Sequence, residues 1–193
     1  KRRMNTELPP MFAIAALAAV SICVVMTPNY GHALPDGIEA ETYAEGLTFP
    51  VAMAPTPDGR ILVTEKFGTV RLVEDGEVRE EPVASFEVKS FNEAGLLGVA
   101  LFPDFEESGE FVVTYTPDRD RDHLYLSKLR LTDDGTAEVL QAPWIELPSR
   151  PEIGRHFGGN VAFTDDHMFV ALSDILDKRT SQQTTNLYGS ILR

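Results

Sequence analysis

Short hydrophobic runs, separated by glycine, proline and aspartate, dominate the chain from about residue 34 to its end. The runs are rich in β-branched and aromatic residues, and they show almost none of the 3.6-residue period of amphipathic helices. Asp75-Gly76 predicts a tight hairpin turn, because both residue types tolerate positive φ angles. The pattern predicts an all-β fold with strands near 60–64, 69–73, 96–101, 111–115, 124–131, 137–147, 157–163 and 168–172.

These strands repeat as units of similar design. Ile61, Phe111 and Met168 occupy equivalent second strands and lie 50 and 57 residues apart. A period of about fifty residues with about four short strands is typical of a β-propeller blade. A β-sandwich is the alternative, but it does not predict the Pro/Asp turn that recurs between the first two strands. About two and a half blades are present, and a propeller needs roughly 4–8 to close.

The first 33 residues have a different composition. Three basic residues precede an uncharged apolar run, Met11–Met26, and a small-residue site follows it. This order indicates a signal peptide over 1–33 and an exported mature part, 34–193, with no stable membrane span after cleavage. An uncleaved N-terminal anchor is the alternative. Since the chain begins with Lys1 and stops inside a strand-like run, we expect it to be a fragment.

Charge and cysteine content exclude several classes. The chain has 17 Lys+Arg against 30 Asp+Glu, a net charge of -13, which argues against nucleic-acid binding. One cysteine, Cys23, excludes a disulfide scaffold and a cysteine-rich zinc site. Asp118, Asp120 and Asp122 have the opening spacing of a calcium loop, but the required Gly and Glu are missing. We interpret them as a solvated hairpin tip, and predict no metal ligand.

The segment 155–160, Arg-His-Phe-Gly-Gly-Asn, is the most informative for chemistry. Two glycines after the histidine let the backbone turn sharply or approach a ligand closely. A histidine at the first strand of a blade points towards the central channel, where propellers bind ligands. Its unperturbed pKa of about 6.5 suits a general base. His156 is therefore the candidate catalytic residue, and a purely structural histidine is the alternative.

Five segments carry a resemblance to a known family, and they are Gly46–Pro50, Pro57–Glu65, Gly95–Phe105, His156–Gly159 and Leu187–Arg193. Together they resemble the soluble glucose/sorbosone dehydrogenases that depend on pyrroloquinoline quinone (PQQ), which include aldose sugar dehydrogenases. The resemblance covers about residues 45–193, and implies a six-bladed propeller in the full protein, located in the periplasm or secreted. It implies that PQQ lies over the channel with a Ca²⁺ ion that polarises it, and that His156 takes the proton of the sugar hydroxyl.

The resemblance also implies three cofactor-binding candidates. Glu93 stands where the family commonly has Gln, and Arg155 stands where Asp or Asn precedes the base. Gln182 precedes Gly189 by seven residues, as in a family segment. Glu93 and Arg155 have opposite charges, so we hypothesise an ion pair between them across the channel face. Ser173-Asp174 replaces the usual Gly-Asp, and the calcium ligands are expected in later blades.

The activity implied for the full-length protein is that of a quinoprotein oxidoreductase acting on CH–OH groups. Its partners would be an aldose or related sugar and an electron acceptor. The alternative is a non-catalytic propeller of the same family that binds a carbohydrate or a protein. This chain alone is expected to be inactive, because the later blades supply the rest of the site.

Overall fold

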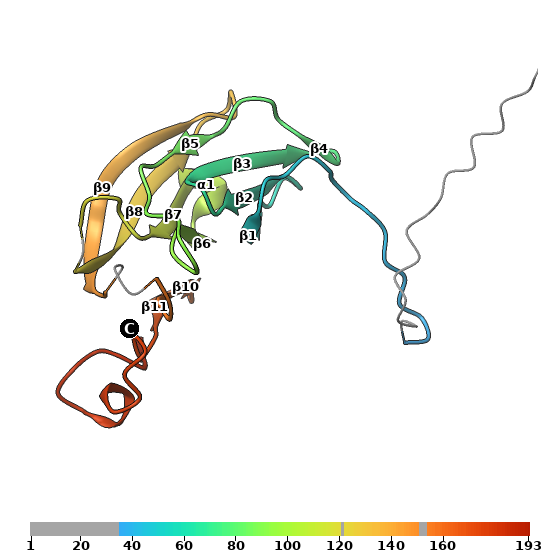
Figure 1. Cartoon of the computed structure of the whole chain (residues 1–193). Helices are drawn as coiled ribbons and strands as arrows, with labels where there is room; N and C mark the ends of the chain where they lie inside the picture. The colour runs from blue at the N-terminus through green and yellow to red at the C-terminus, as the bar shows by residue number, and fades with distance from the viewer. Residues whose placement is uncertain (1–34, 121, 151–153) are drawn as a thin grey trace, which may run out of the picture. The chain divides into compact units, whose positions relative to one another are not determined.

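The computed structural model describes residues 35–120, 122–150 and 154–193 (Figure 1). The predicted signal peptide, 1–33, lies outside the described residues. The chain divides into two units, 1–40 and 41–193. In the described part of the first unit, the Ile38 N–H donates to the Pro35 carbonyl at 3.1 Å. The second unit contains every strand of the described residues.

Three antiparallel sheets follow one another along the second unit. The helical segments of the described residues are short, α1 (Phe105–Ser108) and η2 (Thr180–Gln182). The first sheet has β1 (Pro50–Pro55), β2 (Ile61–Glu65), β3 (Thr69–Glu74), β4 (Glu77–Val78) and, paired with β3, β5 (Ala84–Ser85). The second has β6 (Leu96–Leu101), β7 (Glu110–Tyr115), β8 (His123–Leu131) and β9 (Ala137–Pro148), and the third has β10 (Gly158–Phe163), β11 (Met168–Leu172) and β12 (Ser190–Leu192).

The sheets pack side by side through their first strands. β6 contacts both β1 and β10, and it also contacts β2. Within the second and third sheets, strands that are consecutive in the chain are neighbours in space, as in a propeller blade. The predicted all-β fold and its repeated blades are therefore confirmed, with the second of the three sheets a complete four-stranded blade.

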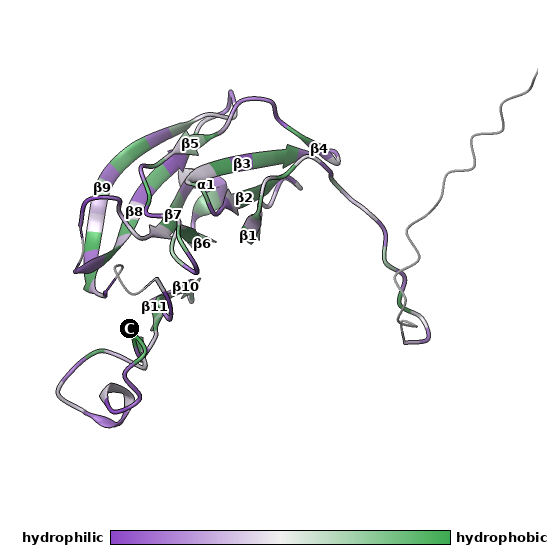
Figure 2. Cartoon of the chain, viewed as in Figure 1, coloured by the Kyte–Doolittle hydropathy of each residue, from purple (hydrophilic) through white to green (hydrophobic). Residues whose placement is uncertain are grey.

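The middle blade is buried on both faces because it lies between the other two. Along β7, Phe111, Val113 and Tyr115 pack in one cluster with the first sheet, where Leu62 and Leu72 are fully buried. Val112 faces the other way and joins a second cluster with the third sheet. Side chains alternate between the faces of a strand, so a strand between two packed neighbours has hydrophobic residues on both faces. Figure 2 shows this difference, since β9 at the outer edge carries many more hydrophilic residues.

Strand direction divides the connecting segments between two ends of the blades. The segments 66–68, 89–95, 154–157 and 173–189 share one end, which we call the upper end. Backbone hydrogen bonds join them there, from Leu96 N–H to the Lys66 carbonyl at 3.0 Å, from Glu93 N–H to the Gly154 carbonyl at 2.8 Å and from Ser173 N–H to the Phe157 carbonyl at 3.3 Å. The turns 56–60, 102–109, 132–136 and 164–167 form the lower end.

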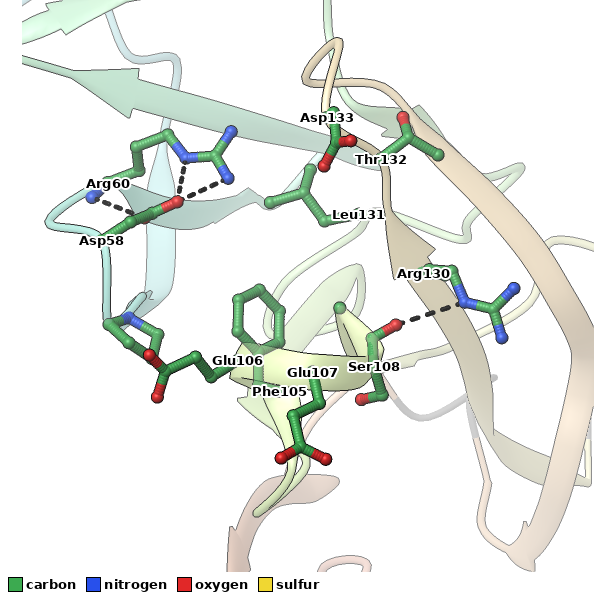
Figure 3. A pocket seen from close by; sticks show the side chains of 12 residues that line it. Asp58, Arg60, Phe105, Glu106, Glu107, Ser108, Arg130, Leu131, Thr132 and Asp133 are labelled. Carbon is green, nitrogen blue, oxygen red and sulfur yellow. Dashed lines mark hydrogen bonds and ion pairs between the residues drawn. The ribbon is translucent and has the colours of Figure 1, made fainter.

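The lower end holds a cavity of about 500 Å³ between α1 and the neighbouring turns (Figure 3). Both of its arginines and Asp58 have polar partners. Arg60 binds the Asp58 carboxylate through Nη2 at 2.7 Å, and Arg130 Nε donates to the Ser108 carbonyl at 3.2 Å. The cavity therefore lies at the opposite end of the strands from His156.

The charge of Asp58 is expected to stabilise its turn in a pH-dependent way. Hydrogen bonds from Arg60 and Thr56 lower the pKa of Asp58 from 3.8 to about 2. A lowered folded-state pKa gives stability that is present above the unfolded-state value and is lost as the pH falls towards 2. We expect Asp58→Asn to lower the free energy of unfolding at pH 7 by no more than about 1 kcal/mol, because the pair is solvent-screened.

Urea unfolding of the wild type and Asp58→Asn at pH 7, 4 and 3 measures this. The difference between the two proteins should shrink across the two acidic points. A difference that stays constant from pH 7 to pH 3 would show that shape, rather than charge, explains the effect of the substitution.

Candidate active site

His156 adopts a backbone conformation that an L-residue rarely takes. It lies two residues before β10 with φ of +57°, in the left-handed region, at a cost of about 1–2 kcal/mol. Gly158 has φ of +78° and lies so close to the Ala171 carbonyl that a Cβ would overlap it. Between them, Phe157 is buried and anchors the segment. This backbone conformation places His156 at the upper end of the blades, outside the strand.

The His156 ring is paired with a carboxylate from the next connecting segment. Its Nδ1 lies 2.7 Å from Oδ1 of Asp174, and the two side chains are 43% and 24% exposed. The hydrogen bond to His156 lowers the pKa of the Asp174 carboxyl below its usual range. An ionised carboxylate only accepts hydrogen bonds, so Nδ1 carries the proton and Nε2 of the neutral ring has the free lone pair. This is the tautomer that a general base needs.

Asp174 is itself fixed by a compact turn after β11. Its Oδ1 accepts the Leu176 N–H at 3.1 Å, and its carbonyl accepts the Thr180 hydroxyl at 3.1 Å. Ile175 and Leu176 have φ of +49° and +64°. Strained backbone is concentrated at the upper end, where five of the six non-glycine residues with positive φ in the described part of the chain lie. Such clustering is common at functional sites.

Glu93 contacts the backbone of His156. One of its carboxylate oxygens, Oε2, accepts the His156 N–H at 2.7 Å, and its own N–H donates to the Gly154 carbonyl. The ion pair hypothesised between Glu93 and Arg155 is absent from the part of the chain that the structure describes. The left-handed turn directs the His156 N–H at the carboxylate, which takes this donor instead of the exposed guanidinium.

Gln182 lies apart from these contacts. It ends η2, is exposed, and donates its backbone N–H to the Arg179 carbonyl at 3.3 Å. Among the described residues, no hydrogen bond joins its side chain to His156, Glu93 or Asp174. The structure therefore brings three of these residues together and leaves Gln182 in the neighbouring loop. Sequence reasoning noted Asp174 only as part of a family segment, and gave it no role.

Within residues 35–120, 122–150 and 154–193, no group of three or more His, Cys, Asp or Glu is arranged to hold a metal ion. In the same residues, no helix has both the length and the hydrophobicity needed to span a bilayer.

Comparisons with known proteins agree with the fold. A family model for glucose/sorbosone dehydrogenases matches residues 47–193. Aldose sugar dehydrogenase YliI of Escherichia coli K12 is 28% identical over 167 residues, covering 83% of this chain and 45% of that protein. The PQQ-bound form of an aldose sugar dehydrogenase from Streptomyces coelicolor superposes with a TM-score of 0.66 at 26% identity, covering 79% of this chain and 46% of its own.

A third relative is not named as a dehydrogenase. Human Hedgehog-interacting protein is 27% identical over 170 residues, covering 77% of this chain and 24% of that protein. The chain thus spans less than half the length of each of these relatives. Since the family model covers most of the sequence, the chain belongs to the glucose/sorbosone dehydrogenase family.

Proposed function

We propose that the full-length protein is a PQQ-dependent dehydrogenase that oxidises a hydroxyl group of an aldose or a related sugar. The observation that carries this proposal is the pairing of His156 with Asp174 at the upper end of the blades. A propeller that only binds a partner has no need for a histidine whose tautomer is set by a contact with a carboxylate. The similarity to aldose sugar dehydrogenases supports the same reaction class.

In this function His156 is the general base. Its Nε2 takes the proton of the sugar hydroxyl, while Asp174 holds the ring through Nδ1 and stabilises the imidazolium that forms. The lowered pKa of Asp174 keeps its carboxyl ionised throughout the pH range in which a histidine base titrates. A positioned base of this kind contributes roughly 10²–10⁴-fold to the rate.

The residues at the upper end fit an anionic cofactor in part. Arg155 is exposed beside His156 and offers a guanidinium to a PQQ carboxylate. Glu93 fits less well, because its carboxylate already accepts a hydrogen bond and would repel an anion. Gln182 is a candidate only through its loop, which Thr180 ties to Asp174. When bound, PQQ supplies the quinone that accepts the hydride.

Three further properties are proposed with this function. The protein is exported by its N-terminal signal peptide to the periplasm or beyond, and it passes electrons to an external acceptor. Calcium belongs to the full-length holoenzyme. The described residues contain no group suited to hold it, so its ligands would come from elsewhere in the protein.

Dye-linked aldose oxidation by the full-length protein, reconstituted with PQQ and Ca²⁺, tests the proposal. Turnover that requires PQQ is the expected result, and the same protein without PQQ is the control. A folded protein that neither binds PQQ nor oxidises aldoses would contradict it, and would favour a binding propeller of the same family.

A further inference from the structure

We propose that Glu93 is a positioning residue that holds the catalytic histidine through its backbone, rather than a ligand of the cofactor. This inference rests on the proposed function, because it assigns Glu93 a task in the same site. It differs from the cofactor-binding role that the sequence suggested for this position, and it follows from where the carboxylate points in the structure.

Two reciprocal hydrogen bonds join the segment around Glu93 to the segment around His156. The Glu93 N–H donates to the Gly154 carbonyl at 2.8 Å, and Glu93 Oε2 accepts the His156 N–H at 2.7 Å. Gly154 has φ of +74°, and its Cα packs so tightly against the Phe91 ring that a Cβ would overlap it. These contacts therefore hold the segment around Glu93 close to the segment around His156.

The partner of the His156 N–H lies outside the sheet. The pairing of β10 with β11 begins at Gly158 opposite Leu172, two residues after His156. The contact with Glu93 is solvent-exposed, so the carboxylate competes with water for this donor. A charged acceptor makes a shorter and stronger hydrogen bond than a carbonyl does. The carboxylate thus stabilises the unusual backbone conformation of the base.

The Glu93 segment is in turn anchored on the first blade. The Lys66 ammonium donates to the Asn92 carbonyl, and the Lys66 carbonyl accepts the Leu96 N–H at 3.0 Å. Gly95 lies against the Lys66 backbone with no room for a Cβ. His156 is consequently fixed at two points, at its N–H by a chain of contacts that reaches back to the first blade and at its ring by Asp174.

This arrangement predicts what different side chains at position 93 would do. Glutamine keeps an oxygen at the same reach, so Glu93→Gln should preserve the contact. Alanine removes the acceptor, and methionine removes it while keeping the length of the side chain. Because a displacement of about 1 Å can cost about 10²-fold in rate, we expect kcat to fall about 10–100-fold in Glu93→Ala and Glu93→Met. Glu93→Gln should stay within about 3-fold of wild type.

The experiment uses the full-length protein with two independent measurements. The first is kcat, KM for the sugar, and the PQQ dissociation constant for each variant, with Glu107→Ala in the exposed α1 at the lower end as the matched control. The second is hydrogen exchange of the His156 amide without PQQ. We expect exchange to accelerate at least about 10-fold in Glu93→Ala and Glu93→Met, and to remain slow in Glu93→Gln and in the control.

The two measurements separate this inference from the proposed function. A loss of PQQ affinity in Glu93→Ala with unchanged exchange of the His156 amide would overturn the positioning role and make Glu93 a cofactor ligand. If the wild type shows no PQQ-dependent turnover, the proposed function fails, and the exchange measurement alone still decides whether Glu93 holds His156. If Glu93→Ala does not fold, Glu93→Met gives the same comparison.

Discussion

Replacing His156 with alanine is expected to lower the PQQ-dependent turnover of the full-length protein by at least about 100-fold. The substitution removes the imidazole whose lone pair takes the sugar hydroxyl proton. Asp174 contacts only the far nitrogen of that ring, so it cannot replace the base. PQQ affinity should change little, because the ring is assigned to the sugar proton and alanine keeps the backbone N–H that Glu93 accepts. Steady-state kinetics at saturating PQQ, with a separate PQQ titration, measure both quantities.

His167→Ala is the matched control for this prediction. His167 is exposed in the turn between β10 and β11 at the lower end, and only its carbonyl takes part in the turn, where it accepts the Thr164 N–H at 2.9 Å. Its removal should leave turnover unchanged. If His156→Ala retained wild-type turnover, or if both variants lost it equally, the assignment of the base would be wrong.

Thr114→Val is expected to destabilise the protein by about 2–4 kcal/mol, although the two side chains have nearly the same shape. Thr114 is fully buried in β7, and its Oγ1 connects two blades. It accepts the Gly98 N–H at 2.8 Å and donates to the Gly159 carbonyl at 2.6 Å. A second methyl group in its place would leave both backbone groups without this partner in a fully buried site.

Urea unfolding monitored by fluorescence measures this loss, and Thr114→Ser is the control. Serine keeps the hydroxyl and loses one methyl group, so it should cost only about 1 kcal/mol. The packing around Thr114 is tight, since a Cβ at Gly98 would overlap both the Gly159 carbonyl and Thr114 Oγ1. A valine variant as stable as the serine variant would mean that the hydroxyl does not join the blades.

Most of the fold could be predicted because each blade carries strong local signals. Leu96–Leu101 and Met168–Leu172 form strands at the predicted residues, and Asp75-Gly76 forms the predicted turn with φ of +51° and +83°. β1 was missed because Pro50–Pro55 consists of proline, alanine, methionine and valine, most of them poor strand formers. Its pairing depends on neighbouring β2 and β6, which a local pattern does not reveal.

The site could be predicted less completely, because its contacts join segments far apart in the chain. His156 was singled out as the candidate base partly because of Gly158 and Gly159, and both glycines do adopt positive φ. The role of Asp174 depends on the turn at Ile175 and Leu176, two residue types that rarely take the left-handed conformation. Opposite charge suggested a partner for Glu93, but the carboxylate binds a main-chain N–H, a donor that every residue except proline carries.

Side chains that bind main-chain groups affect which substitutions this protein can accept during evolution. At the upper end, Lys66, Glu93 and Thr180 all bind main-chain atoms of neighbouring segments. The groups they bind are present whatever the side chain, so the residues that carry these groups can be replaced without removing the contact. A one-residue deletion between Asn92 and Leu96, by contrast, would move the Glu93 carboxylate away from the His156 N–H. For the residues that offer only main-chain groups to these contacts, spacing in the sequence matters more than side-chain identity.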